Sequence, residues 1–134
     1  MESDDVVVGV ANHLTAWVGE LTPNDLAEYL EEPGEADERA PQSRFGADLG
    51  LWYDHDWVFA QASETPVSLR DLARANGIED RELIEEMERR WPKGFAMCFI
   101  ILWNSKLSFT AEQSFAGGRL KCIGTWPHAS PVSD

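Results

Sequence analysis

The residues of this sequence best suited to chemistry lie in the segment LGLWYDHDWVF, residues 49–59. Its centre places His55 between two carboxylates, Asp54 and Asp56, and aromatic residues flank all three on both sides. Such a group is compatible with a metal site, an acid–base centre, or an acidic surface that binds a basic partner. The three functions make different demands on the rest of the chain.

A metal site needs at least three ligands that converge on one point. Successive side chains of a strand point to opposite faces, so His55 can join both Asp54 and Asp56 only in a tight turn. The other histidines, His13 and His128, stand at an expected strand start and in an expected tail, and no His-Glu-x-x-His or Cys-x-x-Cys motif occurs. We therefore expect neither a metal nor another cofactor. A small metal-dependent hydrolase centred on the Asp-His-Asp group is the alternative.

Nucleophilic catalysis has no better support in the sequence. Cys98 lies within the apolar run FAMCFIILW (95–103), and Cys122 lies in an expected strand, where burial keeps a thiol inert. The serines lack a Gly-x-Ser-x-Gly motif, and no Lys-Ser/Thr follows Gly117-Gly118 as in a phosphate-binding loop. We expect a binding protein and no enzyme.

The charge is distributed unevenly along the chain. The net charge is −13, and residues 1–66 hold 15 acidic and 2 basic residues, whereas residues 67–134 hold 9 of each. Such a field repels nucleic acid and anionic lipid and attracts basic partners. A general solubility charge is the other interpretation of the same composition.

The remaining composition predicts a cytoplasmic protein. No apolar run approaches the ~20 residues that a membrane-spanning helix needs. The first residues, MESDDVVVGVANH, are acidic where a signal peptide is basic, and 2 cysteines provide no disulfide framework.

Hydrophobic periodicity and helix caps predict an α+β fold in one domain, residues 1–134. Strands are expected at 13–18, 56–62, 95–103, 107–110 and 119–126, and helices are expected after Thr22, Ser68 and Asp80, with a shorter one at 43–50 that buries Phe45 and Leu49. We expect a mixed, mainly antiparallel sheet of four or five strands with about three helices packed on one face. Residues 1–11 and 128–134 are expected to be loose tails, and 31–42 a flexible loop.

Four pieces of the sequence carry a resemblance to a known family: Phe45, Asp48-Leu49-Gly50, the Tyr53-Asp54-x-Asp56-aromatic run, and Ile123-Gly124-Thr125-Trp126-Pro127. Together with the strand and helix patterns between 14 and 127, they resemble the Imm22 family, small immunity proteins of bacterial polymorphic toxin systems. The resemblance implies an α+β protein that binds and blocks a toxin domain, often a nuclease, in the cytoplasm, with no catalytic residues. The loop 33–43 departs from the family pattern.

The charge and the resemblance lead to one hypothesis for the partner. A nuclease domain must be basic to hold its polyanionic substrate, so an acidic protein can compete for the same groove. The partner-binding residues that we predict are acidic or aromatic: Glu28, Asp48, Trp52, Tyr53, Asp54 and Asp56. A non-immunity module that binds another basic protein would use the same surface.

Overall fold

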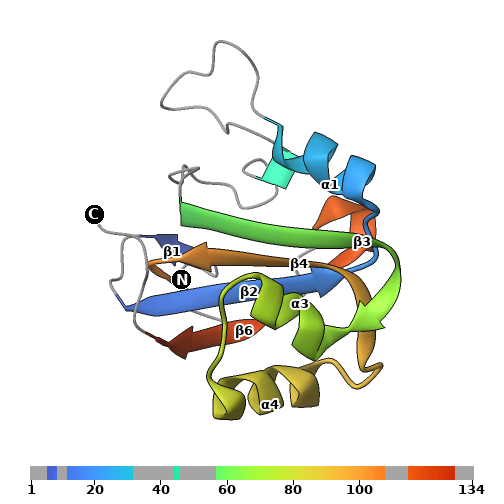
Figure 1. Cartoon of the computed structure of the whole chain (residues 1–134). Helices are drawn as coiled ribbons and strands as arrows, with labels where there is room; N and C mark the ends of the chain where they lie inside the picture. The colour runs from blue at the N-terminus through green and yellow to red at the C-terminus, as the bar shows by residue number, and fades with distance from the viewer. Residues whose placement is uncertain (1–5, 9–11, 32–43, 46–56, 108–114, 129–134) are drawn as a thin grey trace.

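The computed structural model describes residues 6–8, 12–31, 44–45, 57–107 and 115–128. Its main feature is a four-stranded antiparallel sheet with the strand order β3-β4-β2-β6 (Figure 1). The strands are β2 (His13–Gly19), β3 (Val58–Ser68), β4 (Phe95–Trp103) and β6 (Leu120–Pro127). The helices are α1 (Pro23–Leu30), α3 (Leu69–Ala75) and α4 (Arg81–Arg90), with a short 3-10 turn, η2, at Ala116–Gly118. The predicted α+β class and the antiparallel sheet are confirmed.

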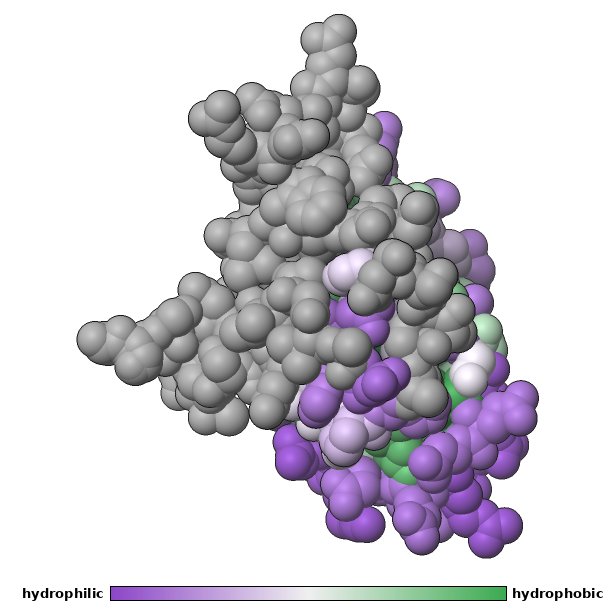
Figure 2. Space-filling view, turned by 90° about the vertical axis from the view of Figure 1, so that its left-hand side faces the viewer, coloured by the Kyte–Doolittle hydropathy of each residue, from purple (hydrophilic) through white to green (hydrophobic). Residues whose placement is uncertain are grey.

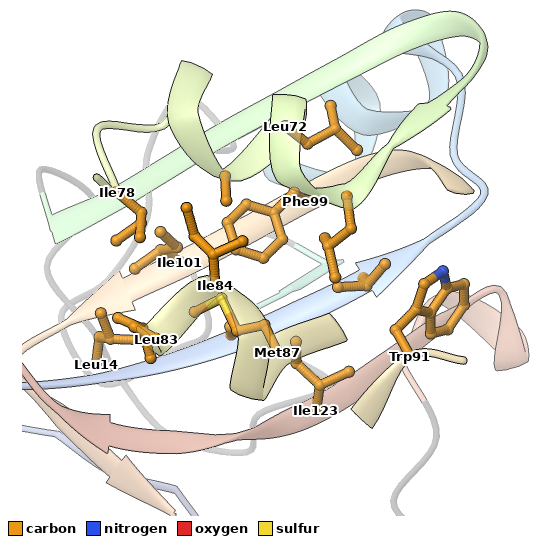
Figure 3. Packing of buried hydrophobic residues seen from close by; sticks show 14 of the residues in the cluster. Leu14, Leu72, Ile78, Leu83, Ile84, Met87, Trp91, Phe99, Ile101 and Ile123 are labelled. Carbon is orange, nitrogen blue, oxygen red and sulfur yellow. The ribbon is translucent and has the colours of Figure 1, made fainter. Parts of the chain in front are cut away.

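Helices α3 and α4 cover one face of the sheet. Side chains of β2 and β4 on this face, such as Leu14 and Phe99, pack with α4 residues that include Ile84 and Met87 (Figure 3). Leu72 of α3, also labelled in Figure 3, belongs to the same core cluster. This face holds the larger part of the described core.

Helix α1 lies on the opposite face, which corrects the prediction that the helices pack on one face. Its buried residues Leu26 and Tyr29 form a second core with Trp17 of β2, Ile100 of β4, and Phe45. The central strands β2 and β4 are apolar on both sides, so both faces of the sheet need a cover that excludes water.

The helix starts follow the predicted caps. The Thr22 hydroxyl accepts the N–H of Asp25 (3.2 Å), and the Ser68 hydroxyl accepts the N–H of Asp71 (3.1 Å). Asp80 accepts two backbone N–H groups at the start of α4. Each cap satisfies donors that the first helical turn leaves without partners.

A second, two-stranded sheet was not predicted. Residues 6–8, which we expected in a loose tail, form β1 (Val6–Val8), and β1 pairs antiparallel with β5 (Ser105–Leu107). Asn104 has a positive φ of 57° directly after β4, and the backbone of Leu107 pairs with that of Val6 instead of returning beside β4. The expected strand residues 108–110 lie outside the described residues.

Candidate functional site

Only one of the six predicted partner-binding residues belongs to the described part of the chain. Glu28 lies on α1 with its side chain exposed. The other five, Asp48, Trp52, Tyr53, Asp54 and Asp56, lie outside the described residues, as do His55 and the predicted loop 31–42 apart from Glu31. Among the described residues, the candidate site therefore lies around Glu28 and helix α1.

Helix α1 is held firmly and presents a carboxylate face to solvent. Leu26 and Tyr29 bury one side of the helix, whereas Glu28 is exposed and Asp25 is partly exposed. Residues three apart lie on one side of a helix, so Asp25 and Glu28 belong to one acidic surface, which Glu31 continues as the exposed C-cap. We call Asp25, Glu28 and Glu31 the α1 acidic face.

One carboxylate of this face already has a cation. Arg119, directly before β6, donates from Nη2 to the Asp25 carboxylate at 2.6 Å. This hydrogen bond, supported by the Arg119 charge and by the Thr22 cap, holds the pKa of Asp25 below its ordinary value. No described cation forms an ion pair with Glu28.

A groove runs beside the α1 acidic face. It has a volume of about 340 Å³. Its lining combines the two carboxylates and Tyr29 of α1 with two arginines and the η2 turn: Leu21, Asp25, Glu28, Tyr29, Arg44, Ala116, Gly117 and Arg119. A groove of this kind can accept a cationic or hydrogen-bonding side chain from a partner.

Phe45 belongs to the core beneath α1. Its ring is 0% exposed and lies edge-on to Trp17, with ring centroids 4.9 Å apart, and it also contacts Tyr29 and Phe115 at 5.8 and 6.3 Å. The sequence prediction that Phe45 is buried is confirmed. The neighbouring Arg44 side chain is exposed.

A second groove lies at the end of the sheet where β2 ends and β6 begins. We call it the sheet-end groove, with a volume of about 780 Å³. Its lining is Val18, Glu20, Trp91, Pro92, Lys93, Gly118, Arg119, Leu120 and Lys121. Arg119 belongs to both grooves, so the two are neighbours.

The sheet-end groove is cationic although the protein is acidic. It holds three basic side chains, Lys93, Arg119 and Lys121, and one carboxylate, Glu20. Lys93 donates to Glu20 at 3.2 Å and lies over the Trp91 ring, 5.3 Å from its centroid. Sequence analysis did not single out these cations, because they lie on separate elements and the second half of the chain is electrically balanced.

The described residues offer little reactive chemistry. Burial raises the pKa of the Cys98 thiol and raises the pKa of Cys122 to about 11, so both thiols stay protonated at neutral pH. Within the described ranges, no three His, Cys, Asp or Glu side chains are placed to hold one metal ion. No described helix is long and apolar enough to cross a membrane.

The described surface is mainly hydrophilic. On the face that Figure 2 shows, the hydrophobic residues of the described part form only small areas between hydrophilic ones. Among the described large hydrophobic residues, Phe95 stands out with 59% of its surface exposed. Contacts of the described surface with a partner would therefore be governed largely by charge and hydrogen bonding.

Comparison of the chain with protein-family models, curated proteins and solved structures returned no match. We therefore infer the function from the chain's own residues and charges.

Proposed function

We propose that this chain is an immunity protein that binds a basic toxin domain in the cytoplasm and blocks its active surface. The observation that carries the proposal is the exposure of negative charge in the first half of the chain. That half holds the whole net charge of −13, and its described carboxylates are all exposed or partly exposed: Glu20, Asp25, Glu28, Glu31 and Glu64.

The α1 acidic face supports this function by its rigidity. A capped helix whose apolar side is buried fixes the backbone positions from which Glu28 and Asp25 extend before the partner arrives. Carboxylates on an ordered backbone lose less conformational entropy on binding than carboxylates on a loose segment. The face is therefore suited to a preformed row of basic side chains, such as those that line the substrate groove of a nuclease.

The mechanism we propose is electrostatic occlusion. Long-range attraction between the acidic protein and a basic domain accelerates association to about 10⁸–10⁹ M⁻¹s⁻¹ at low salt. The bound carboxylates then occupy the positions that phosphates of the substrate would take. Because the charges are exposed, salt screens the attraction over about 8–10 Å.

The test uses the toxin domain that the proposal predicts to be encoded beside the gene of this protein. We expect the full chain to inhibit that domain at a one-to-one ratio, with an association rate that falls as salt increases. Glu28→Gln, and separately Asp54→Asn with Asp56→Asn, should slow association at low salt and flatten its salt dependence. Glu85→Gln is the matched control, since Glu85 is an exposed glutamate on α4, in the electrically balanced half.

Three results would contradict the proposal or part of it. Absence of inhibition at stoichiometric amounts would exclude the immunity function toward that toxin. Stoichiometric Zn²⁺ or Mn²⁺ on the purified protein, lost in His55→Ala, would favour the metal-dependent hydrolase instead. Inhibition that Glu85→Gln weakens as much as Glu28→Gln would show a general charge effect without a defined binding face.

A further inference from the structure

The sequence contains one Asn-Gly pair, Asn76-Gly77, and the structure places it at the end of α3. In an unfolded chain this pair is prone to deamidation, because glycine has no side chain to hinder attack by its own backbone nitrogen. The nitrogen of Gly77 attacks the side-chain carbonyl carbon of Asn76, the bond from that carbon to Nδ2 breaks, and ammonia leaves a succinimide. Water then opens the ring to aspartate or isoaspartate.

The fold holds the leaving group of this reaction. Asn76 is 3% exposed, and its Nδ2 donates to the Phe59 carbonyl of β3 at 3.2 Å and to the Phe99 carbonyl of β4 at 3.3 Å. Only the NH₂ of the amide can donate to two carbonyls, so these contacts fix its orientation. Nδ2 can therefore leave as ammonia only after both hydrogen bonds break.

The nucleophile is held as well. The Gly77 N–H donates to the Arg74 carbonyl at 3.0 Å, and the Ile78 N–H donates to the Ala73 carbonyl at 2.9 Å, so both close the end of α3. Gly77 has a φ of 93°, a left-handed conformation that suits glycine. Ile78 is fully buried in the core that α3 and α4 share with the sheet (Figure 3). The pair can therefore react only in molecules in which this end of α3 has opened.

We propose that Asn76-Gly77 is a latent modification site, which is closed in the folded protein and reacts once α3 leaves the sheet, and that its reaction prevents the chain from refolding. Aspartate at this position would place a carboxylate, which cannot donate, against the Phe59 and Phe99 carbonyl oxygens in a buried site. Isoaspartate would also lengthen the main chain by a methylene group where Gly77 and Ile78 close the helix. This inference does not depend on toxin binding.

The first experiment compares the rate of deamidation in the folded and the unfolded full chain. The protein is incubated at pH 8 in buffer or in guanidinium chloride, each with a thiol reductant, and is then digested with trypsin. Cleavage after Arg74 and Arg81 releases residues 75–81, ANGIEDR, whose amide and acid forms mass spectrometry distinguishes. We expect conversion to be about a hundredfold slower in buffer, because only opened molecules react. Similar rates in the two conditions, or no conversion in guanidinium chloride, would overturn the proposal.

The second experiment measures whether the acid form refolds. After partial conversion in guanidinium chloride, the chain is diluted into buffer, and size-exclusion chromatography separates the refolded protein from chains that stay unfolded or aggregate. The 75–81 peptide from the refolded fraction should contain asparagine, and the acid form should collect in the other fraction. An equal share of the acid form in both fractions would contradict the block on refolding.

A pair of variants tests the same block without the reaction. Asn76→Asp introduces the aspartate product directly, whereas Asn24→Asp makes the same change at an exposed position of α1. We expect Asn76→Asp to unfold at a lower urea concentration than the unchanged protein, or not to fold, and Asn24→Asp to match the unchanged protein. If Asn76→Asp is as stable as Asn24→Asp, the proposal is wrong. The rate comparison uses the unchanged chain, so it stands as a test even when Asn76→Asp does not fold.

Discussion

Replacement of Phe45 by alanine tests whether its segment belongs to the core beneath the α1 acidic face. The ring is fully buried between Trp17, Tyr29 and Phe115. Truncation of a buried phenylalanine costs about 3–5 kcal/mol. Loss of the edge-on contact with Trp17, worth about 0.5–1.5 kcal/mol by itself, favours the upper part of that range. Since domains of this size unfold at a cost of about 5–15 kcal/mol, Phe45→Ala should leave a marginally stable protein.

Urea unfolding, followed by tryptophan fluorescence and far-UV circular dichroism, measures this loss. Phe45→Leu keeps most of the apolar volume and should cost clearly less than Phe45→Ala. Arg44→Ala changes an exposed neighbour and should stay within about 0.5 kcal/mol of the unchanged protein. A loss below about 1 kcal/mol in Phe45→Ala, with an unchanged dependence on urea, would show that the aromatic cluster contributes little to the core.

Three further predictions concern the same end of the molecule and the buried thiol. Gly19→Ala should lower the free energy of unfolding by about 3 kcal/mol, because a Cβ at this position would overlap the Arg119 carbonyl. Gly118→Ala should lower it by about 1–2 kcal/mol, because Gly118 has open space around it but a positive φ. Equal losses of stability in thermal unfolding would refute the close approach of the backbone at Gly19. Arg119→Gln should raise the pKa of Asp25 toward 3.8, which a carboxyl NMR titration measures. In the unchanged protein the pKa of Asp25 is lower in the folded than in the unfolded state, so the ion pair stabilises the fold above pH 3.8. The stability difference between the two proteins should therefore be present above pH 3.8 and vanish as the pH falls through the folded-state pKa of Asp25. At pH 8, Cys122 should react with a disulfide reagent about a hundredfold more slowly in the folded protein than after unfolding, because burial raises its pKa to about 11. Rapid labelling of the folded chain would contradict this prediction, because it would show that the thiol is accessible as a thiolate.

The parts of the fold that the sequence predicted are those that local chemistry determines. Thr22, Ser68 and Asp80 start helices because a cap needs only a side chain and the next turn of backbone. The 95–103 run is apolar on both faces, which identified a central strand. The side of the sheet on which α1 lies depends on which strand face needs a cover, and this is a property of the assembled sheet.

The features that sequence analysis missed depend on contacts between distant residues. Strand β1 has three residues and exists through its pairing with β5, about a hundred residues away. The sheet-end groove unites three cations: Lys93 from the α4–β4 connection, Arg119 directly before β6, and Lys121 within β6. Each of these cations has an unremarkable local sequence, so only the close approach of β2 and β6 reveals them as a group. By contrast, the exposure of Glu28 followed from the helical spacing of Leu26 and Tyr29.

Because of its ion pair with Arg119, Asp25 is less available to a partner than Glu28 on the α1 acidic face. A basic partner that binds Asp25 must displace Arg119 or share the carboxylate with it, so part of the new attraction only replaces an existing 2.6 Å contact. Glu28 has no such competitor among the described cations, and its pairing with a partner is a net gain. We therefore expect Glu28→Gln to slow association with a basic toxin domain more than Asp25→Asn does, although both remove one charge. If Asp25→Asn has the larger effect, the partner displaces Arg119 from its ion pair with Asp25.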